Sequence, residues 1–188
     1  MWRTVSDWLQ RVSNGWIAIA SLLIFLLFTA LVLPGQSSES ESTTGIAGSP
    51  DMSFYYSPDE LYQMAKSYGA EGRQAYIRAR FTFDLVWPLV YGFFLAAGIS
   101  WTFRHAFSDE AKWQRANLVP ILAVMFDYLE NISTSLVISR YPSSTAVLDW
   151  LASVFTMAKW IFVAGSFGLL LIGIVVGISK RVNMRSSQ

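Results

Sequence analysis

Four long apolar runs dominate the sequence, and polar segments separate them. The runs cover about residues 16–34, 81–103, 118–139 and 148–178. A helix needs about 20 mostly apolar residues to cross the roughly 30 Å hydrocarbon core of a bilayer. Each run reaches about that length, so the sequence predicts an all-α polytopic membrane protein, a bundle of four transmembrane helices. Pro34 is the last residue of the first run and Gly35 follows it, and we expect this pair to end the first helix.

The polar segment between the first two runs, residues 35–80, divides into two parts. Residues 35–53 are rich in Ser, Gly and Thr, which is typical of a flexible tether. Residues 57–80 predict a short external helical segment that rests on the membrane surface. It opens with a capping residue, a proline at the first helical position and two acids, which are Ser57, Pro58, Asp59 and Glu60. A lid over a substrate is the alternative interpretation of these helices.

Basic residues near the ends of the apolar runs predict the orientation. Most lie in residues 1–15, 104–117 and 179–188, which four crossings would place on one side. They are Arg3, Arg11, Arg104, Lys112, Arg115, Lys180, Arg181 and Arg185. The positive-inside rule makes this side cytoplasmic, although Arg78 and Arg80 precede the second run on the opposite side. We therefore expect the protein to lie in a bacterial plasma (inner) membrane, with both termini on the cytoplasmic side and residues 140–147 in an external loop.

The first run also has the basic flank of a cleaved signal peptide. Its apolar stretch is longer than the usual h-region of 7–15 residues, and no clean A-x-A site follows it. We therefore interpret it as an uncleaved transmembrane helix.

Composition narrows the function classes. Hydrophobic residues make up 53% of the chain and charged residues 14%, whereas soluble domains carry about 25% charged residues. A net charge of +1 excludes nucleic-acid binding by charge alone. The sequence has no cysteine and one histidine, which excludes disulfides, thiolate metal sites and histidine-rich metal sites. We expect no metal and no cofactor.

Five polar residues interrupt the predicted transmembrane helices: Asp84, Asp127, Glu130, Asn131 and Lys159. Each ionised group near the bilayer centre costs about 2.5–3.5 kcal/mol, so these groups must face one another, face water or lose their charge. Helical spacing places Asp127, Glu130 and Asn131 on one face. Counted from the loop at residues 140–147, Glu130 and Lys159 lie at similar depths. We therefore predict an ion pair between them.

This predicted cluster has more negative than positive charge. Three carboxyl groups face one lysine, and a low-dielectric site favours protonation of at least one of them. Such a cluster could bind a proton, a cation or a polar lipid head group, or it could serve helix packing alone. A separate GxxxG motif, Gly173 to Gly177, predicts close helix contact within the chain or with a second copy.

The residues from 57 to 131 resemble a family of uncharacterised bacterial four-span membrane proteins. The shared pattern is G-R-x-x-Y, then D-x-x-x-P-x-x-Y-G, then D-x-x-E-N. The matching positions are Gly72, Arg73, Tyr76, Asp84, Pro88, Tyr91, Gly92, Asp127, Glu130 and Asn131. The resemblance implies a multi-pass fold and supports the polar cluster as a site, and it implies no particular reaction.

Three functions are compatible with these features. We favour an integral membrane protein that binds a proton, a cation or a polar lipid at the cluster, alone or as an accessory subunit of a membrane complex. A membrane-embedded enzyme acting on a lipid or isoprenoid is the second, with Glu130 or Asp127 as general acid/base and Lys159 stabilising negative charge. A purely structural scaffold is the third. The expected partners are membrane lipid and either another membrane protein or a second copy, and no nucleic acid.

Overall fold

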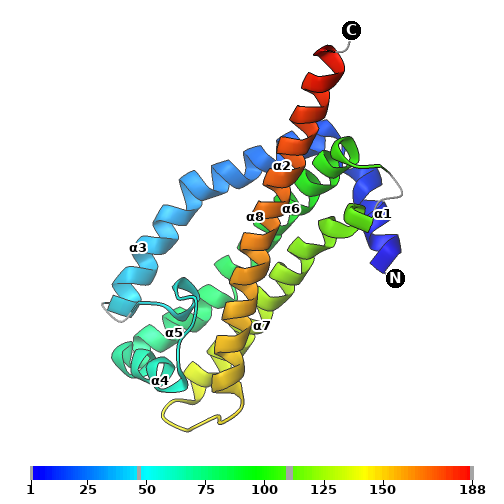
Figure 1. Ribbon diagram of the computed structural model, residues 1–188. Helices are drawn as coiled ribbons and strands as arrows, with labels where there is room; N and C mark the ends of the chain where they lie inside the picture. Colours follow the sequence, from blue (N-terminus) through cyan, green and yellow to red (C-terminus); the bar gives the residue numbers. More distant parts are fainter. Residues whose placement is uncertain (1, 46–47, 109–111, 187–188) are drawn as a thin grey trace. The chain divides into compact units, whose positions relative to one another are not determined.

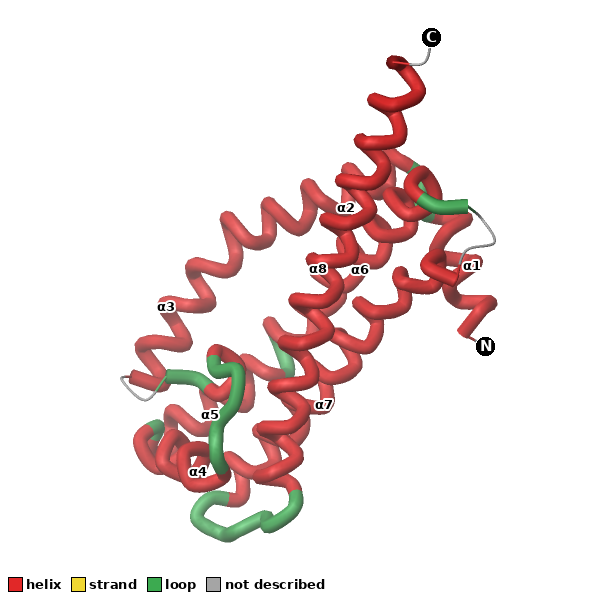
Figure 2. Tube along the Cα trace, viewed as in Figure 1, coloured by secondary structure: helices red, strands yellow, loops and turns green. Residues whose placement is uncertain are grey.

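The structure is a computed structural model that describes residues 2–45, 48–108 and 112–186 (Figure 1). The described residues form helices joined by loops, with no β-strand among them (Figure 2). This confirms the predicted all-α class. Four helical stretches of the described chain are long and apolar enough to cross a membrane: Gly15–Ser38, Gly69–Ala106, Lys112–Arg140 and Leu148–Met184. The chain is therefore a multi-pass membrane protein by the length and composition of its helices.

The chain divides into two compact units, and the long helices pass from one unit into the other. Unit 1 comprises Met1–Leu26, Val90–Leu122 and Phe162–Gln188. Unit 2 comprises Leu27–Leu89 and Ala123–Ile161.

The first transmembrane helix does not end at Pro34-Gly35, so that prediction was wrong. Helix α2 (Gly15–Leu27) continues through a π-helical turn, η1 (Phe28–Val32), into α3 (Leu33–Thr44). Proline lacks an N–H group, and its ring clashes with the carbonyl four residues earlier in an α-helix. The wider turn immediately before it, in which the Leu33 N–H bonds to the carbonyl of Phe28, shifts the carbonyls that Pro34 would meet. Residues 35–44 are consequently helical, whereas the sequence predicted a flexible tether there.

The external helical segment and the remaining helices agree more closely with the sequence. Its two helices are α4 (Pro58–Ser67) and α5 (Gly69–Arg80), and Gly69 between them has φ of +65°. The Ser57 hydroxyl accepts a bond from the Glu60 N–H at 3.3 Å, and the Glu60 carboxylate accepts one from the Ser57 N–H at 2.7 Å. This capping box is what the sequence at the start of α4 encodes.

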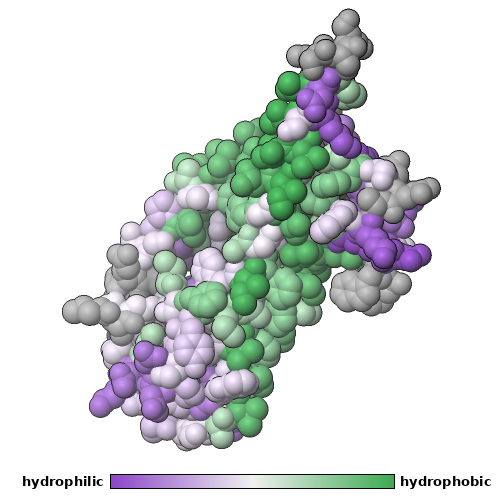
Figure 3. Space-filling view, in the orientation of Figure 1, coloured by the Kyte–Doolittle hydropathy of each residue, from purple (hydrophilic) through white to green (hydrophobic). Residues whose placement is uncertain are grey.

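The later helices are α6 (Phe83–Ala106), α7 (Val119–Arg140) and α8 (Leu148–Ser186). Helix α8 extends past residue 178, so residues 179–186 continue the helix and do not form a separate tail. The predicted N-terminal segment holds α1 (Trp2–Val12), and the predicted loop at 104–117 holds most of a 3-10 helix, η4 (Lys112–Leu118). Figure 3 shows hydrophobic residues covering the surface of α8 over much of its length, with hydrophilic residues towards its end.

Helices α6 and α8 approach closely in unit 1. A Cβ atom on Gly173 would lie 2.4 Å from the Thr102 hydroxyl oxygen, so only glycine fits this position without a shift. Gly177 has no such neighbour within 4 Å. Of the predicted pair of packing glycines, Gly173 serves a contact within the chain and Gly177 faces open space.

The core of unit 2 joins α4 and α5 to α7 and α8. Its buried members are Tyr56, Leu61, Ala65, Tyr68, Tyr76, Val137, Ile138 and Ala152. The chain before α4 packs into this core through Tyr56, whose side chain is 1% exposed. Burial of these aromatic and aliphatic side chains holds the segment around residues 48–57 against α8.

Candidate functional site

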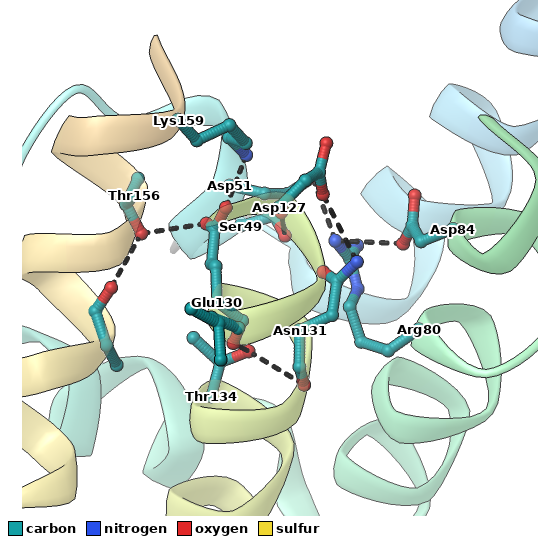
Figure 4. Close-up of polar contacts among 12 residues, drawn as sticks. Ser49, Asp51, Arg80, Asp84, Asp127, Glu130, Asn131, Thr134, Thr156 and Lys159 are labelled. Atoms are coloured by element: carbon teal, nitrogen blue, oxygen red, sulfur yellow. Dashed lines mark hydrogen bonds and ion pairs between the residues drawn. The ribbon is translucent and has the colours of Figure 1, made fainter. Parts of the chain in front are cut away.

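A network of charged and polar side chains lies inside unit 2 (Figure 4). We call it the interior network. Its members come from α5, α6, α7, α8 and the segment before α4, and they are Ser49, Asp51, Tyr56, Arg80, Asp84, Asp127, Glu130, Asn131, Thr134, Thr156 and Lys159. All are buried except Asp51, which is half-buried.

The ion pair predicted between α7 and α8 is present. Lys159 Nζ lies 2.5 Å from Glu130 Oε2, and the two side chains are 7% and 1% exposed. The second Glu130 oxygen, Oε1, accepts a bond from the Thr156 hydroxyl at 2.8 Å. Thr156 and Lys159 are three residues apart on α8, so they share the face that meets Glu130.

Tyr56 extends this pair towards the segment before α4. Its hydroxyl oxygen lies 3.1 Å from the Thr156 hydroxyl oxygen. Burial and the nearby Glu130 raise the pKa of Tyr56 well above its ordinary value, so the phenol keeps its proton and can donate to Thr156. Thr156 in turn also bonds to the Ala152 carbonyl, at 3.0 Å. Glu130 is therefore linked through Thr156 to a residue outside the transmembrane helices.

Arg80 holds two further carboxylates. Its Nη1 atom lies 3.0 Å from Asp51 Oδ2 and 2.9 Å from Asp84 Oδ2. Its guanidinium also stacks over the Tyr76 ring, 4.6 Å from the centroid. Ser49 donates a hydrogen bond to Asp51. Burial by itself would raise the pKa of Asp51, but the positive charges of Arg80 and Lys159 outweigh it and lower the pKa to about 2.

Asp127 and Asn131 form the middle of the network. The Asn131 amide nitrogen donates to Asp127 Oδ1 at 3.2 Å, one turn apart on α7. The Asn131 side chain is 3% exposed, yet its Oδ1 atom has no hydrogen-bond partner among the described residues. A buried amide oxygen without a partner is uncommon in proteins, and it offers a lone pair to a donor or a small cation.

The structure thus brings the five residues predicted from the sequence into one region. Glu130 pairs with Lys159, Asp127 accepts a hydrogen bond from Asn131, and Asp84 forms an ion pair with Arg80. Sequence reasoning placed Arg80 just before the second apolar run but did not include it in the site, and it missed Asp51 and Tyr56. Asp51 lies in residues 35–53, which were interpreted as a tether, and Tyr56 lies between this tether and the predicted helical segment at residues 57–80. The aromatic run Phe54-Tyr55-Tyr56 was the available signal, and Tyr56 is the residue of this run that is buried.

The wider surroundings bear on what the network can do. A pocket of about 260 Å³ in unit 2 is lined by Gln36, Ala75, Arg78, Ala79, Thr82 and Phe83, and no member of the interior network lines it. Among the described residues, no group of three or more His, Cys, Asp and Glu side chains is arranged to hold a metal ion.

Comparisons with protein-family models, with curated proteins and with solved structures found no match to this chain. The resemblance to a bacterial four-span family therefore stays a prediction.

Proposed function

We propose that the protein is a multi-pass membrane protein that binds a proton or a small monovalent cation in the interior network. The observation that carries this proposal is the excess of negative charge. The network contains four carboxyl groups, those of Asp51, Asp84, Asp127 and Glu130, against two cationic groups, those of Arg80 and Lys159. Uncompensated charge is costly in a low-dielectric interior, and a bound proton or cation removes part of it.

The geometry favours this function over the two alternatives. A network that only stabilised packing would have its polar atoms satisfied, whereas Asn131 Oδ1 lacks a partner among the described residues beside a carboxylate. An enzyme acting on a lipid would need a cavity that reaches the acids, and the pocket near Arg78 gives no support for one, because none of the acids lines it. A polar lipid head group meets the same obstacle, because the network residues are 0–7% exposed apart from Asp51.

Infrared spectroscopy tests the proton site directly. We expect a pH-dependent carboxyl C=O band in the purified protein that disappears in one of the variants Asp84→Asn, Asp127→Asn or Glu130→Gln. Asp59→Asn is the matched control, because Asp59 is an exposed acid of unit 2. The cation alternative predicts a thermal midpoint that rises with Na⁺ or K⁺ and not with choline at equal ionic strength. A protein with neither the band nor a cation-dependent midpoint would contradict the proposal.

The distribution of charge supports the proposed orientation. Unit 1 contains eight basic residues, whereas unit 2 contains six, of which Arg80 and Lys159 are buried in the interior network. The positive-inside rule then supports a cytoplasmic location for the ends of the helices in unit 1, including both termini. We propose that the membrane is a bacterial inner membrane, as the resemblance implies.

The absence of cysteine makes this orientation simple to test. Single cysteines can replace Thr4 in unit 1 and Ser144 in unit 2, both of which are exposed. A maleimide that does not cross membranes should label the Ser144→Cys variant in intact cells, and it should label the Thr4→Cys variant after lysis. The reverse pattern would overturn the orientation and leave the proton-site proposal untouched.

A further inference from the structure

Helix α1 is fixed on η4 by a set of buried hydrogen bonds within unit 1. The Ser6 hydroxyl donates to Asn117 Oδ1 at 2.8 Å, and the Asn117 amide nitrogen donates to the Ser6 carbonyl at 3.1 Å. One turn further along, the Gln10 amide donates to Gln114 Oε1 at 2.9 Å. Asn117 also donates to the Ser100 hydroxyl of α6 at 3.0 Å. These bonds determine which side of α1 faces outward.

The exposed residues of α1 and η4 include cations and tryptophan rings. The exposed cations are Arg3, Arg11, Lys112 and Arg115. Trp8 of α1 is 54% exposed and Trp113 of η4 is 64% exposed. Asp7 is the one acidic residue in the sequences of these two elements. We call this set of exposed residues the basic aromatic face.

Chain connectivity places the basic aromatic face at the depth of the lipid head groups. Helix α1 ends at Val12, and the first candidate transmembrane stretch begins at Gly15. The 3-10 helix η4 forms the first residues of the third candidate stretch, Lys112–Arg140, and α7 begins directly after it. Elements this close to the ends of transmembrane helices cannot move far from the interface, where tryptophan rings and basic side chains bind favourably.

We propose that the basic aromatic face is a binding surface for the head groups of anionic lipids. Positive side chains near a membrane surface attract anionic lipids, and the effect falls off within a Debye length. The two tryptophan rings would lie at the boundary between head groups and acyl chains. This inference is independent of the interior network, because every residue that carries it belongs to unit 1.

Lipid nanodiscs test the proposal with the intact chain. We expect the wild-type protein to melt about 2–4 °C higher in nanodiscs containing phosphatidylglycerol than in pure phosphatidylcholine, and the difference to shrink in 0.5 M salt. The variant Arg3→Gln/Arg11→Gln/Lys112→Gln/Arg115→Gln should lose most of the difference. The control variant Lys66→Gln/Arg140→Gln removes two exposed cations of unit 2 and should keep it.

Three results would overturn the proposal. Equal midpoints in the two lipids would show that the face does not respond to anionic head groups. Loss of the difference in the control variant would show that the effect does not come from this face. The same stabilisation by inorganic phosphate added to phosphatidylcholine nanodiscs would assign the face to a free anion instead of a membrane surface.

A second measurement covers the case in which the variant with four Gln substitutions does not fold. Phosphatidylglycerol with brominated acyl chains quenches nearby tryptophans, so it should quench wild-type fluorescence more than brominated phosphatidylcholine does. The excess quenching should be lost in Trp8→Phe/Trp113→Phe, and its persistence would contradict a location of these rings at the lipid boundary.

Discussion

Removing the ammonium of Lys159 is expected to destabilise the protein strongly. Lys159→Met leaves the buried Glu130 carboxylate without the charge that lies 2.5 Å away. Breaking a buried ion pair from one side costs about 3–5 kcal/mol. For a chain of 188 residues this corresponds to a fall of about 6–20 °C in the thermal midpoint. Glu130→Gln should destabilise for the same reason, since it leaves the ammonium unpaired.

The double variant separates the ion pair from other effects of the two substitutions. Glu130→Gln/Lys159→Met removes both charges together, so its loss should be smaller than the sum of the two single losses by about 1–3 kcal/mol. Intrinsic tryptophan fluorescence during heating in one detergent at pH 7 measures all midpoints. Lys66→Met, at an exposed position, is the control and should melt like the wild type. Additive losses, or a Lys159→Met variant that melts like the parent, would refute the argument.

Three further predictions follow from other parts of the structure. Arg80→Gln should lower the unfolding free energy by about 3–5 kcal/mol, because it leaves two carboxylates without their shared cation. The thermal midpoints of the variant and the wild type, measured side by side, test this. The pKa of Asp51 is lowered from 3.8 to about 2, so the ionised carboxylate adds about 2 kcal/mol to the free energy of unfolding. This contribution is complete above about pH 4 and is lost as the pH falls towards 2. Asp51→Asn should therefore flatten the acid limb of the stability curve, and an unchanged limb would contradict the pairing. Gly173→Ala should cost about 1–3 kcal/mol through overlap with α6, while Gly177→Ala should be neutral, and equal midpoints for the two would refute the packing argument.

The sequence predicted the helices well because the signal that defines them is long. Runs of about 20 apolar residues fix the approximate bounds of the later three transmembrane helices. Pro34 misled because the usual effect of proline assumes a regular α-helix before it, and the π-helical turn at Phe28–Val32 changes that geometry. Nothing in the run of apolar residues there distinguishes a π-turn from an α-turn.

The interior network could be predicted in part. Helical spacing and depth were enough to pair Glu130 with Lys159. Both residues lie in regular helices joined by one short loop, so their depths can be counted from that loop. Asp51 could not be paired in this way, because it comes from a segment whose path depends on tertiary packing. Its polar, glycine-containing surroundings resemble a linker, and burial of the nearby Tyr56 holds this segment where the Asp51 carboxylate meets Arg80.

The uneven burial of the four transmembrane stretches sets how each can vary in evolution. The most apolar windows of Gly15–Ser38 and Leu148–Met184 are 6% and 11% buried, against 56% and 50% for the two middle stretches. In the first and last stretches, exchanges among Leu, Ile, Val and Phe leave the lipid-facing surface equally apolar, so relatives should diverge freely there. Natural variation should be sparse in α6 and α7, where a substituted side chain must fit a neighbour. An alignment of relatives would therefore show variable sequence in the first and last transmembrane stretches and restrained sequence in α6 and α7.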